Sequence, residues 1–140
     1  MLKIYRIIAV IGLLLLFSNC GGDNKSTDTA EAKKVEFKLT GNDQMKYNLN
    51  TMVVKEGEEV TVHFENIGKM AKEVMGHNFV LLKTGVDLPT FAAKAMTAKE
   101  NEYIPTDEVD NIIVHSKMLG PGEKTVIEFT APAKGSYKYI

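Results

Sequence analysis

The chain has 140 residues, 44% of them hydrophobic and 25% charged, which is enough for one domain with one core. Its formal net charge is −1, and no run of like charges is long enough to form an interaction tail, so we expect no nucleic-acid partner. Cys20 is the only cysteine, so we expect neither a disulfide nor a thiolate ligand within residues 21–140.

Residues 1–19 have the pattern of a secretory signal peptide. Lys3 and Arg6 form a short basic region, and an apolar stretch follows over residues 7–17. This stretch is too short for a membrane-spanning helix, which needs about 20 apolar residues. It has the length of the apolar part of a signal peptide, so the sequence predicts an exported protein.

Cys20 follows this segment directly, and its position resembles the cleavage box of bacterial lipoproteins, in which the cysteine becomes the lipid-bearing first residue. An ordinary signal peptide with an incidental cysteine is the alternative. The residues after Cys20 are small, polar and charged, which is typical of a flexible tether. We expect a lipid anchor at Cys20, a tether over residues 20–34 and a folded domain over residues 35–140.

Short runs of apolar residues separated by turns continue from residue 35 to the end. In residues 59–66, Val60, Val62 and Phe64 are predicted to face inward, and Thr61 and His63 outward. The other segments with a strand pattern are 35–39, 79–83, 111–117, 125–129 and 136–140. Strands at this spacing, with Gly-, Pro- and Asn-rich turns between them, predict an all-β sandwich or barrel.

Residues 87–100, DLPTFAAKAMTAKE, break the strand pattern and predict one helix. Their apolar residues recur at helical spacing, and Pro89 suits the first turn of a helix. We expect Phe91 and Met96 to pack on the sandwich rather than to take part in chemistry, and we expect Met52 to fill the core in the same way.

Three motifs in this arrangement resemble the azurin family of blue-copper proteins. They are GNDQM at residues 41–45, VMGHN at 74–78 and HSKMLGPGEK at 115–124. The resemblance runs from about residue 35 to residue 140. It implies the cupredoxin fold, a Greek-key β-sandwich with one inserted α-helix. It also implies an electron-transfer protein with copper as cofactor and no enzymatic activity.

The resemblance implies that His77 is a copper ligand, that Gly76 supplies a weak backbone oxygen, and that Asn78 holds the loop through side-chain hydrogen bonds. Blue copper is held by two imidazoles, one thiolate and a weak axial methionine. From VMGHNFV alone, a turn histidine without a metal is the alternative. We expect His63 to be exposed on its strand. His115 is also expected to be exposed, because its counterpart in azurins is not a ligand.

In the azurin pattern the thiolate, the second imidazole and the methionine lie in one loop, after a strand similar to residues 136–140, and a final strand follows. All of these would come after Ile140, so the chain as printed lacks these ligands and the final strand, and we expect the gene to continue. If it ended there, the alternative is a copper-free binding or structural module. A multidomain copper oxidase is a weaker alternative for one short domain.

Met45 and Met75 flank the turns near the expected copper end, and we expect them to form part of an apolar patch at which partners dock. The resemblance implies redox partners such as cytochromes or reductases. Together with the export signal and Cys20, it predicts a lipid-anchored protein of the periplasm or outer membrane.

Overall fold

The structure, a computed structural model, describes residues 33–140. The predicted signal peptide, Cys20 and residues 20–32 of the predicted tether lie outside the described residues. The first strand begins at Lys34, one residue before the expected start of the domain.

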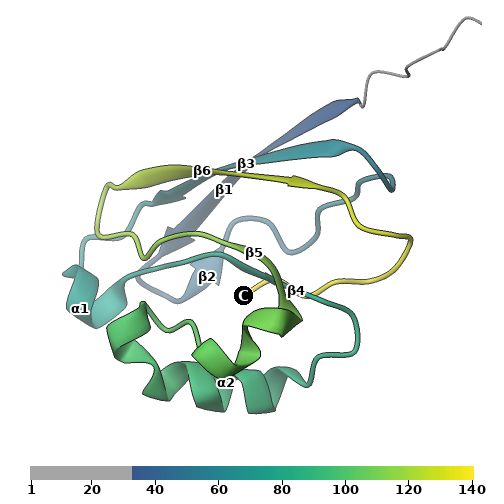
Figure 1. Ribbon diagram of the computed structural model, residues 1–140. Coiled ribbons are helices and arrows are strands. Elements are labelled where there is room, and N and C mark those ends of the chain that lie inside the picture. Colours follow the sequence, from purple (N-terminus) through teal and green to yellow (C-terminus); the bar gives the residue numbers. More distant parts are fainter. Residues whose placement is uncertain (1–32) are drawn as a thin grey trace, which may run out of the picture. The chain divides into compact units, whose positions relative to one another are not determined.

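One sheet has four strands in the order β2-β1-β3-β6 (Figure 1). β1 (Lys34–Asn42) runs parallel to β3 (Glu59–Asn66) and antiparallel to the short β2 (Lys46–Tyr47). β6 (Lys124–Thr130) pairs antiparallel with the other side of β3. β3 is therefore covered by a neighbour along both edges.

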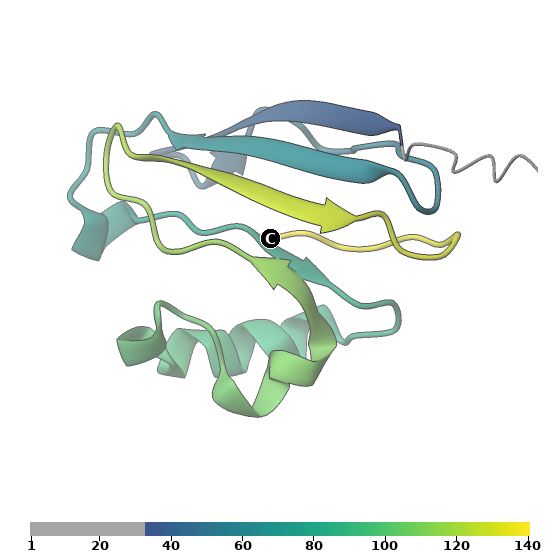
Figure 2. The same ribbon diagram turned by 45° about the horizontal axis from the view of Figure 1, so that its top comes forward.

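The second sheet consists of β4 (Val80–Leu82) and β5 (Ile112–His115), which pair antiparallel. The last residues of the chain lie along the other side of β4, where Ile140 and Val80 exchange two backbone hydrogen bonds, of 2.8 and 3.0 Å. Figure 2 shows the two sheets as separate layers, with the C-terminal segment beside β4. The predicted β-sandwich is confirmed.

The predicted helix is α2 (Leu88–Thr97), which covers the outer side of β4 and β5 (Figure 1). The Asp87 side chain caps it by accepting a hydrogen bond from the Thr90 backbone N–H, and Pro89 occupies the first turn. Phe91 is its buried residue and packs against β4.

Three further helical segments were not predicted. They are α1 (Lys72–Met75) and the 3-10 helices η1 (Lys99–Asn101) and η2 (Thr106–Asn111). They are too short to produce a helical period in the sequence. Within residues 33–140, no helix combines the length and the apolar character needed to cross a membrane.

The main core lies between the two sheets, and Leu39, Val62, Phe64 and Phe79 are almost completely buried in it. Met52 packs against this core, as predicted.

The prediction that Met96 packs on the sandwich is wrong, because Met96 is 73% exposed. Phe91 and Ala95, one helical turn apart, face β4, and Met96 lies off this stripe.

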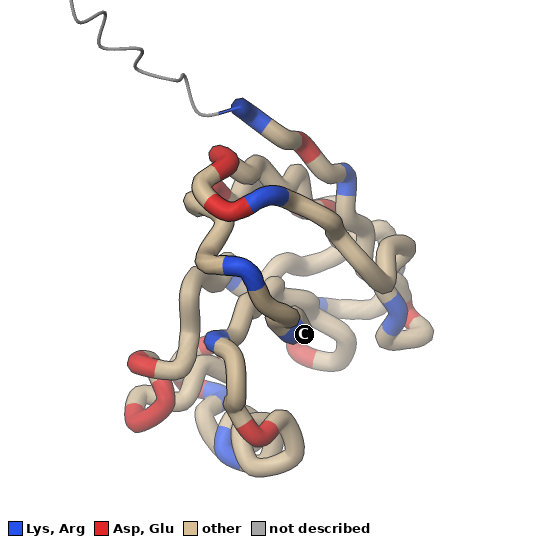
Figure 3. Tube along the Cα trace, turned by 90° about the vertical axis from the view of Figure 1, so that its right-hand side faces the viewer, with Lys and Arg blue, Asp and Glu red and all other residues tan. Residues whose placement is uncertain are grey.

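The outer face of the four-stranded sheet carries charged residues of both signs. His63 is exposed there, as predicted, and its Nε2 lies 3.4 Å from the Glu36 carboxylate. Thr61, predicted to face outward, is only 3% exposed, and its hydroxyl donates a hydrogen bond to Glu128 on β6. Figure 3 views the molecule from the right-hand side of Figure 1 and shows acidic and basic residues interspersed along the chain. His115, at the end of β5, is exposed as predicted.

Leu39→Ala should lower the free energy of unfolding by about 2–5 kcal/mol, because it removes buried methyl groups and leaves a cavity. Met96→Ala is the control and should change it by less than about 0.5 kcal/mol, as expected for an exposed side chain. Guanidinium unfolding of both variants measures the difference. Equal unfolding midpoints for the two variants would contradict the placement of Leu39 in the core.

Candidate metal centre

His77, the predicted ligand, lies between the end of α1 and the start of β4 (Figure 1). Before it, Gly76 ends α1 and donates its N–H to the Lys72 carbonyl at 2.8 Å. His77 and Leu119 exchange two backbone hydrogen bonds, of 3.1 and 2.7 Å. This bridge extends the pairing of the second sheet, so both the N–H and the C=O of His77 are paired with Leu119.

The imidazole of His77 reaches across to the other sheet. Its Nε2 lies 2.9 Å from the carbonyl oxygen of Asn42, the last residue of β1. A carbonyl oxygen can only accept, so Nε2 carries a proton, and in the neutral imidazole the lone pair is then on Nδ1. Within residues 33–140, the His77 ring makes its hydrogen bond through Nε2, so Nδ1 is left able to bind a metal.

Gly41 provides the surface on which this ring lies. A Cβ atom at position 41 would be 3.0 Å from both Cγ and Cδ2 of the His77 ring, closer than nearly all real contacts. The motif GNDQM therefore contributes the space for the ring at Gly41 and the acceptor for its N–H at Asn42. Sequence reasoning quoted this motif but did not give either residue a role.

A glycine is required at position 76 for a reason that the sequence did not show. A glycine lets the backbone approach a metal without a Cβ in the way. In the structure, a Cβ there would also lie 2.6 Å from the Lys72 carbonyl oxygen and 2.8 Å from Sδ of Met118. The carbonyl oxygen of Gly76 accepts no hydrogen bond from residues 33–140, so it is available as a ligand.

Asn78 ties the loop to two distant segments. Its Nδ2 donates to the Glu102 carbonyl at 2.8 Å, and its own carbonyl accepts a hydrogen bond from the Tyr47 hydroxyl at 2.7 Å. Burial, and to a smaller degree Tyr139, raises the pKa of Tyr47 far above its usual value, so this hydroxyl stays protonated and donates.

Asn66, at the end of β3, is a fully buried polar residue that sequence reasoning missed. Its Nδ2 donates to the Leu119 carbonyl at 3.0 Å and more weakly to the Met75 carbonyl at 3.4 Å. The Leu119 carbonyl thus accepts from both Asn66 and His77. The alternation of β3 could have identified Asn66, because it continues the inward-facing positions of that strand.

The surface at this end of the sandwich carries exposed apolar side chains. Met45 is 79% exposed, and Met75 is partly buried. The carboxylate of Asp43 accepts hydrogen bonds from the backbone of Lys69 and Met70, which joins the turn before Met45 to the loop before α1. That loop and α1 expose Ile67, Met70 and Val74.

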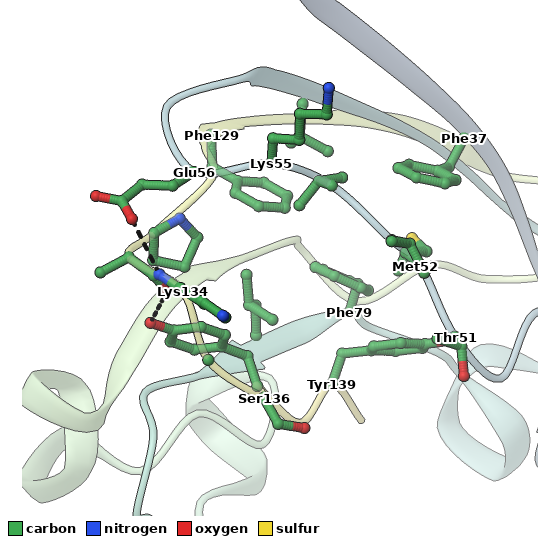
Figure 4. Close-up of a pocket in the computed structure, with 18 of the residues that line it drawn as sticks. Phe37, Thr51, Met52, Lys55, Glu56, Phe79, Phe129, Lys134, Ser136 and Tyr139 are labelled. Atoms are coloured by element: carbon green, nitrogen blue, oxygen red, sulfur yellow. Dashed lines mark hydrogen bonds between the residues drawn. The ribbon is translucent and has the colours of Figure 1, made fainter.

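A separate groove of about 700 Å³ lies between residues 50–56 and residues 132–139. Figure 4 shows aromatic and aliphatic side chains around it, among them Phe37, Met52, Phe79 and Tyr139. No histidine, cysteine or aspartate lines the groove, so it is distinct from the candidate metal centre.

The residues at His77 fit part of a copper site. The described part of the chain contains no group of three or more His, Cys, Asp or Glu side chains that could hold a metal. It does supply one imidazole nitrogen, a donor that suits copper, and one unpaired peptide oxygen. The hydrogen bond from Nε2 to a carbonyl is the support that metal-binding histidines generally have.

Comparison with known proteins identifies the family. Residues 33–140 match the family model described as copper binding proteins, plastocyanin/azurin family, and the chain belongs to this family. It is 39% identical over 100 residues to an azurin of Achromobacter denitrificans, and 34% identical over 100 residues to an azurin of Pseudomonas aeruginosa. Each match covers 70% of this chain and 66% of the azurin, so the chain spans about two thirds of these relatives.

Solved structures agree with this assignment. The chain is similar to auracyanin A of Chloroflexus aurantiacus, described as a "blue" copper protein, with a TM-score of 0.67 and 28% identity over 76% of this chain and 85% of that one. It is also similar to the reduced auracyanin of Roseiflexus castenholzii, with a TM-score of 0.64 and 32% identity over 79% and 84% of the two chains. The predicted cupredoxin fold and azurin resemblance are confirmed, and copper is the metal of this family.

Gly41→Ala should displace the His77 ring. The added methyl group overpacks the contact, so we expect a loss of about 1–3 kcal/mol in stability and altered NMR signals of the His77 imidazole. Thr40→Ala, at the preceding residue, is the control and should leave these signals in place. If the His77 signals of Gly41→Ala coincide with those of the parent, the ring does not lie on Gly41.

Proposed function

We propose that this chain belongs to a copper protein that carries single electrons between redox partners and is not an enzyme. The observation that carries the proposal is the arrangement of His77, whose Nε2 is committed to the Asn42 carbonyl while Nδ1 is left free. Membership of the plastocyanin/azurin family supports copper as the metal.

In this proposal, Nδ1 of His77 and, more weakly, the carbonyl oxygen of Gly76 hold the copper ion. Copper supplies the one-electron redox couple when it is bound. The protein contributes fixed positions: the ring is held by Asn42, and the backbone around it is held by Leu119 and Asn78. Ligands held by such supporting hydrogen bonds rearrange little when the charge of the metal changes.

We propose that a thiolate, a second imidazole and a methionine from residues after Ile140 complete the site, as the azurin resemblance implies. The pairing of the last residues with β4 supports this, because Ile140 lies opposite Val80. A chain continuing in the same antiparallel direction would run past Phe79 toward His77. The missing ligands would then come from the segment nearest to the site.

We further propose that an additional strand of the longer protein covers the apolar groove. Residues 50–54 and residues 137–139 border the groove. Within the part of the chain that the structure describes, the backbone N–H and C=O groups of residues 50–54 have no hydrogen-bond partner. A strand placed there would pair these groups and bury the surrounding aromatic rings.

Redox proteins such as cytochromes or reductases are the proposed partners, and the apolar surface around Met45 and Met75 is their proposed docking site. Flexible methionine side chains suit a surface that must fit more than one partner. The exposed residues Ile67, Met70 and Val74 in the neighbouring loop and α1 extend this surface.

The copper proposal is tested with the protein expressed from its whole gene. Loaded with Cu(II), it should show the intense visible absorption of a thiolate–copper site, whereas residues 1–140 alone should bind Cu(II) weakly and stay colourless. His77→Gly in the whole protein should change the spectrum, and added imidazole should partly restore it. His115→Gly, at the exposed histidine, is the control.

A whole protein that turns blue with an unchanged spectrum in His77→Gly would show that His77 is not a ligand. A whole protein that stays colourless with copper would favour the copper-free binding or structural module instead.

For the N-terminus we propose lipidation at Cys20 after export, with attachment to a periplasmic membrane surface. One acyl chain binds membranes weakly, but bacterial lipoproteins carry several, which makes attachment stable. In cell fractionation, the original protein should sediment with membranes and Cys20→Ser should be released, while Ser18→Ala serves as the control. Membrane attachment that persists in Cys20→Ser, with no lipid mass on Cys20, would contradict the proposal.

A further inference from the structure

Glu102 lies beside the candidate metal centre although it is far from His77 in the sequence. It follows η1 in a left-handed conformation, with φ +55°, and Tyr103 after it has φ +65°. Among the described residues that are not glycine, only these two and Met45 have positive φ. This conformation is unfavourable for residues with a Cβ, so the contacts around Glu102 must hold it.

Glu102 makes three contacts with segments around His77. Its backbone carbonyl accepts from Nδ2 of Asn78 at 2.8 Å, and its carboxylate Oε2 accepts from the Met118 backbone N–H at 3.0 Å. Its Oε1 lies 3.5 Å from Nζ of Lys72. The ion pair with Lys72 is weak, because both side chains are more than 40% exposed. The two hydrogen bonds therefore carry most of the interaction.

Both hydrogen-bond partners adjoin the bonds that hold His77. Asn78 is the next residue in the chain, and Met118 precedes Leu119, which exchanges two backbone hydrogen bonds with His77. Met118 is 7% exposed, and its N–H has no other acceptor within residues 33–140. Removal of the Glu102 carboxylate would leave the Met118 N–H without an acceptor. An unpaired donor in a buried place lowers the local stability and favours local opening.

We propose that Glu102 is a positioning residue for His77: its carbonyl fixes Asn78, and its carboxylate fixes the segment that pairs with His77. The inference rests on the proposed function in one respect, that His77 is the residue that binds copper. The positioning itself is a property of the metal-free protein, so it can be measured without copper.

The test is amide hydrogen exchange by NMR on metal-free protein. In Glu102→Ala, the amides of His77, Met118 and Leu119 should exchange about tenfold faster, as expected for the loss of one buried hydrogen bond. The amides of the four-stranded sheet should keep their rates. Glu102→Gln should restore most of the protection, because its amide oxygen can accept from Met118.

Glu100→Ala is the control, because Glu100 is an exposed carboxylate in the same 3-10 helix. It should leave all rates unchanged. Exchange at His77 and Leu119 within twofold of the parent in Glu102→Ala would overturn the proposal. So would a failure of Glu102→Gln to restore protection, or equal acceleration in both sheets. If exchange responds as expected while His77→Gly leaves the copper spectrum unchanged, the positioning role stands and the copper function falls.

Discussion

The imidazole of His77 rests on Gly41 and donates its Nε2 proton to the carbonyl of Asn42, and the candidate centre depends on this contact. His77 precedes the first strand of one sheet, and Gly41 and Asn42 end the first strand of the other. This hydrogen bond therefore joins the two layers of the sandwich at one end, together with those that Asn66 and Tyr47 donate. The bond to Asn42 also places the proton on Nε2, which leaves the lone pair of the neutral ring on Nδ1. The packing of the two sheets therefore determines which nitrogen of His77 can bind a metal.

Several polar groups around the loop that contains His77 are hydrogen-bonded to its backbone or to that of its neighbours. Asn66, Ser116 and Tyr47 donate hydrogen bonds to backbone carbonyls around the loop. In residues 33–140, no buried side-chain nitrogen or oxygen lacks a hydrogen-bond partner. A polar network satisfied in this way stiffens the surrounding structure. Stiffness is the property that an electron carrier needs around its metal, and the apolar core adjoins this network through the buried Leu119.

The relation between sequence and structure differs from element to element. The alternation of β3 predicted the burial of Val62 and Phe64, because a strand between two neighbours has one face in the core. The same alternation could not predict that Thr61 is buried and hydrogen-bonded, because its partner, Glu128, lies on another strand. Met96 has a helical spacing compatible with burial, but the orientation of α2 on the second sheet leaves it in solvent.

The sequence by itself determined the strand pattern, the position of α2 and the family, because periodicity, turn residues and motifs are local properties. It also singled out His77, Gly76 and Asn78 through the motif that contains them.

Only the tertiary structure decided how the loop is held, through Gly41, Asn66 and Glu102. These residues act through hydrogen bonds and close contacts with segments 9 to 53 residues away, and nothing in the local sequence encodes such a partner. Their roles exist only once the two sheets and the loops between them are packed together.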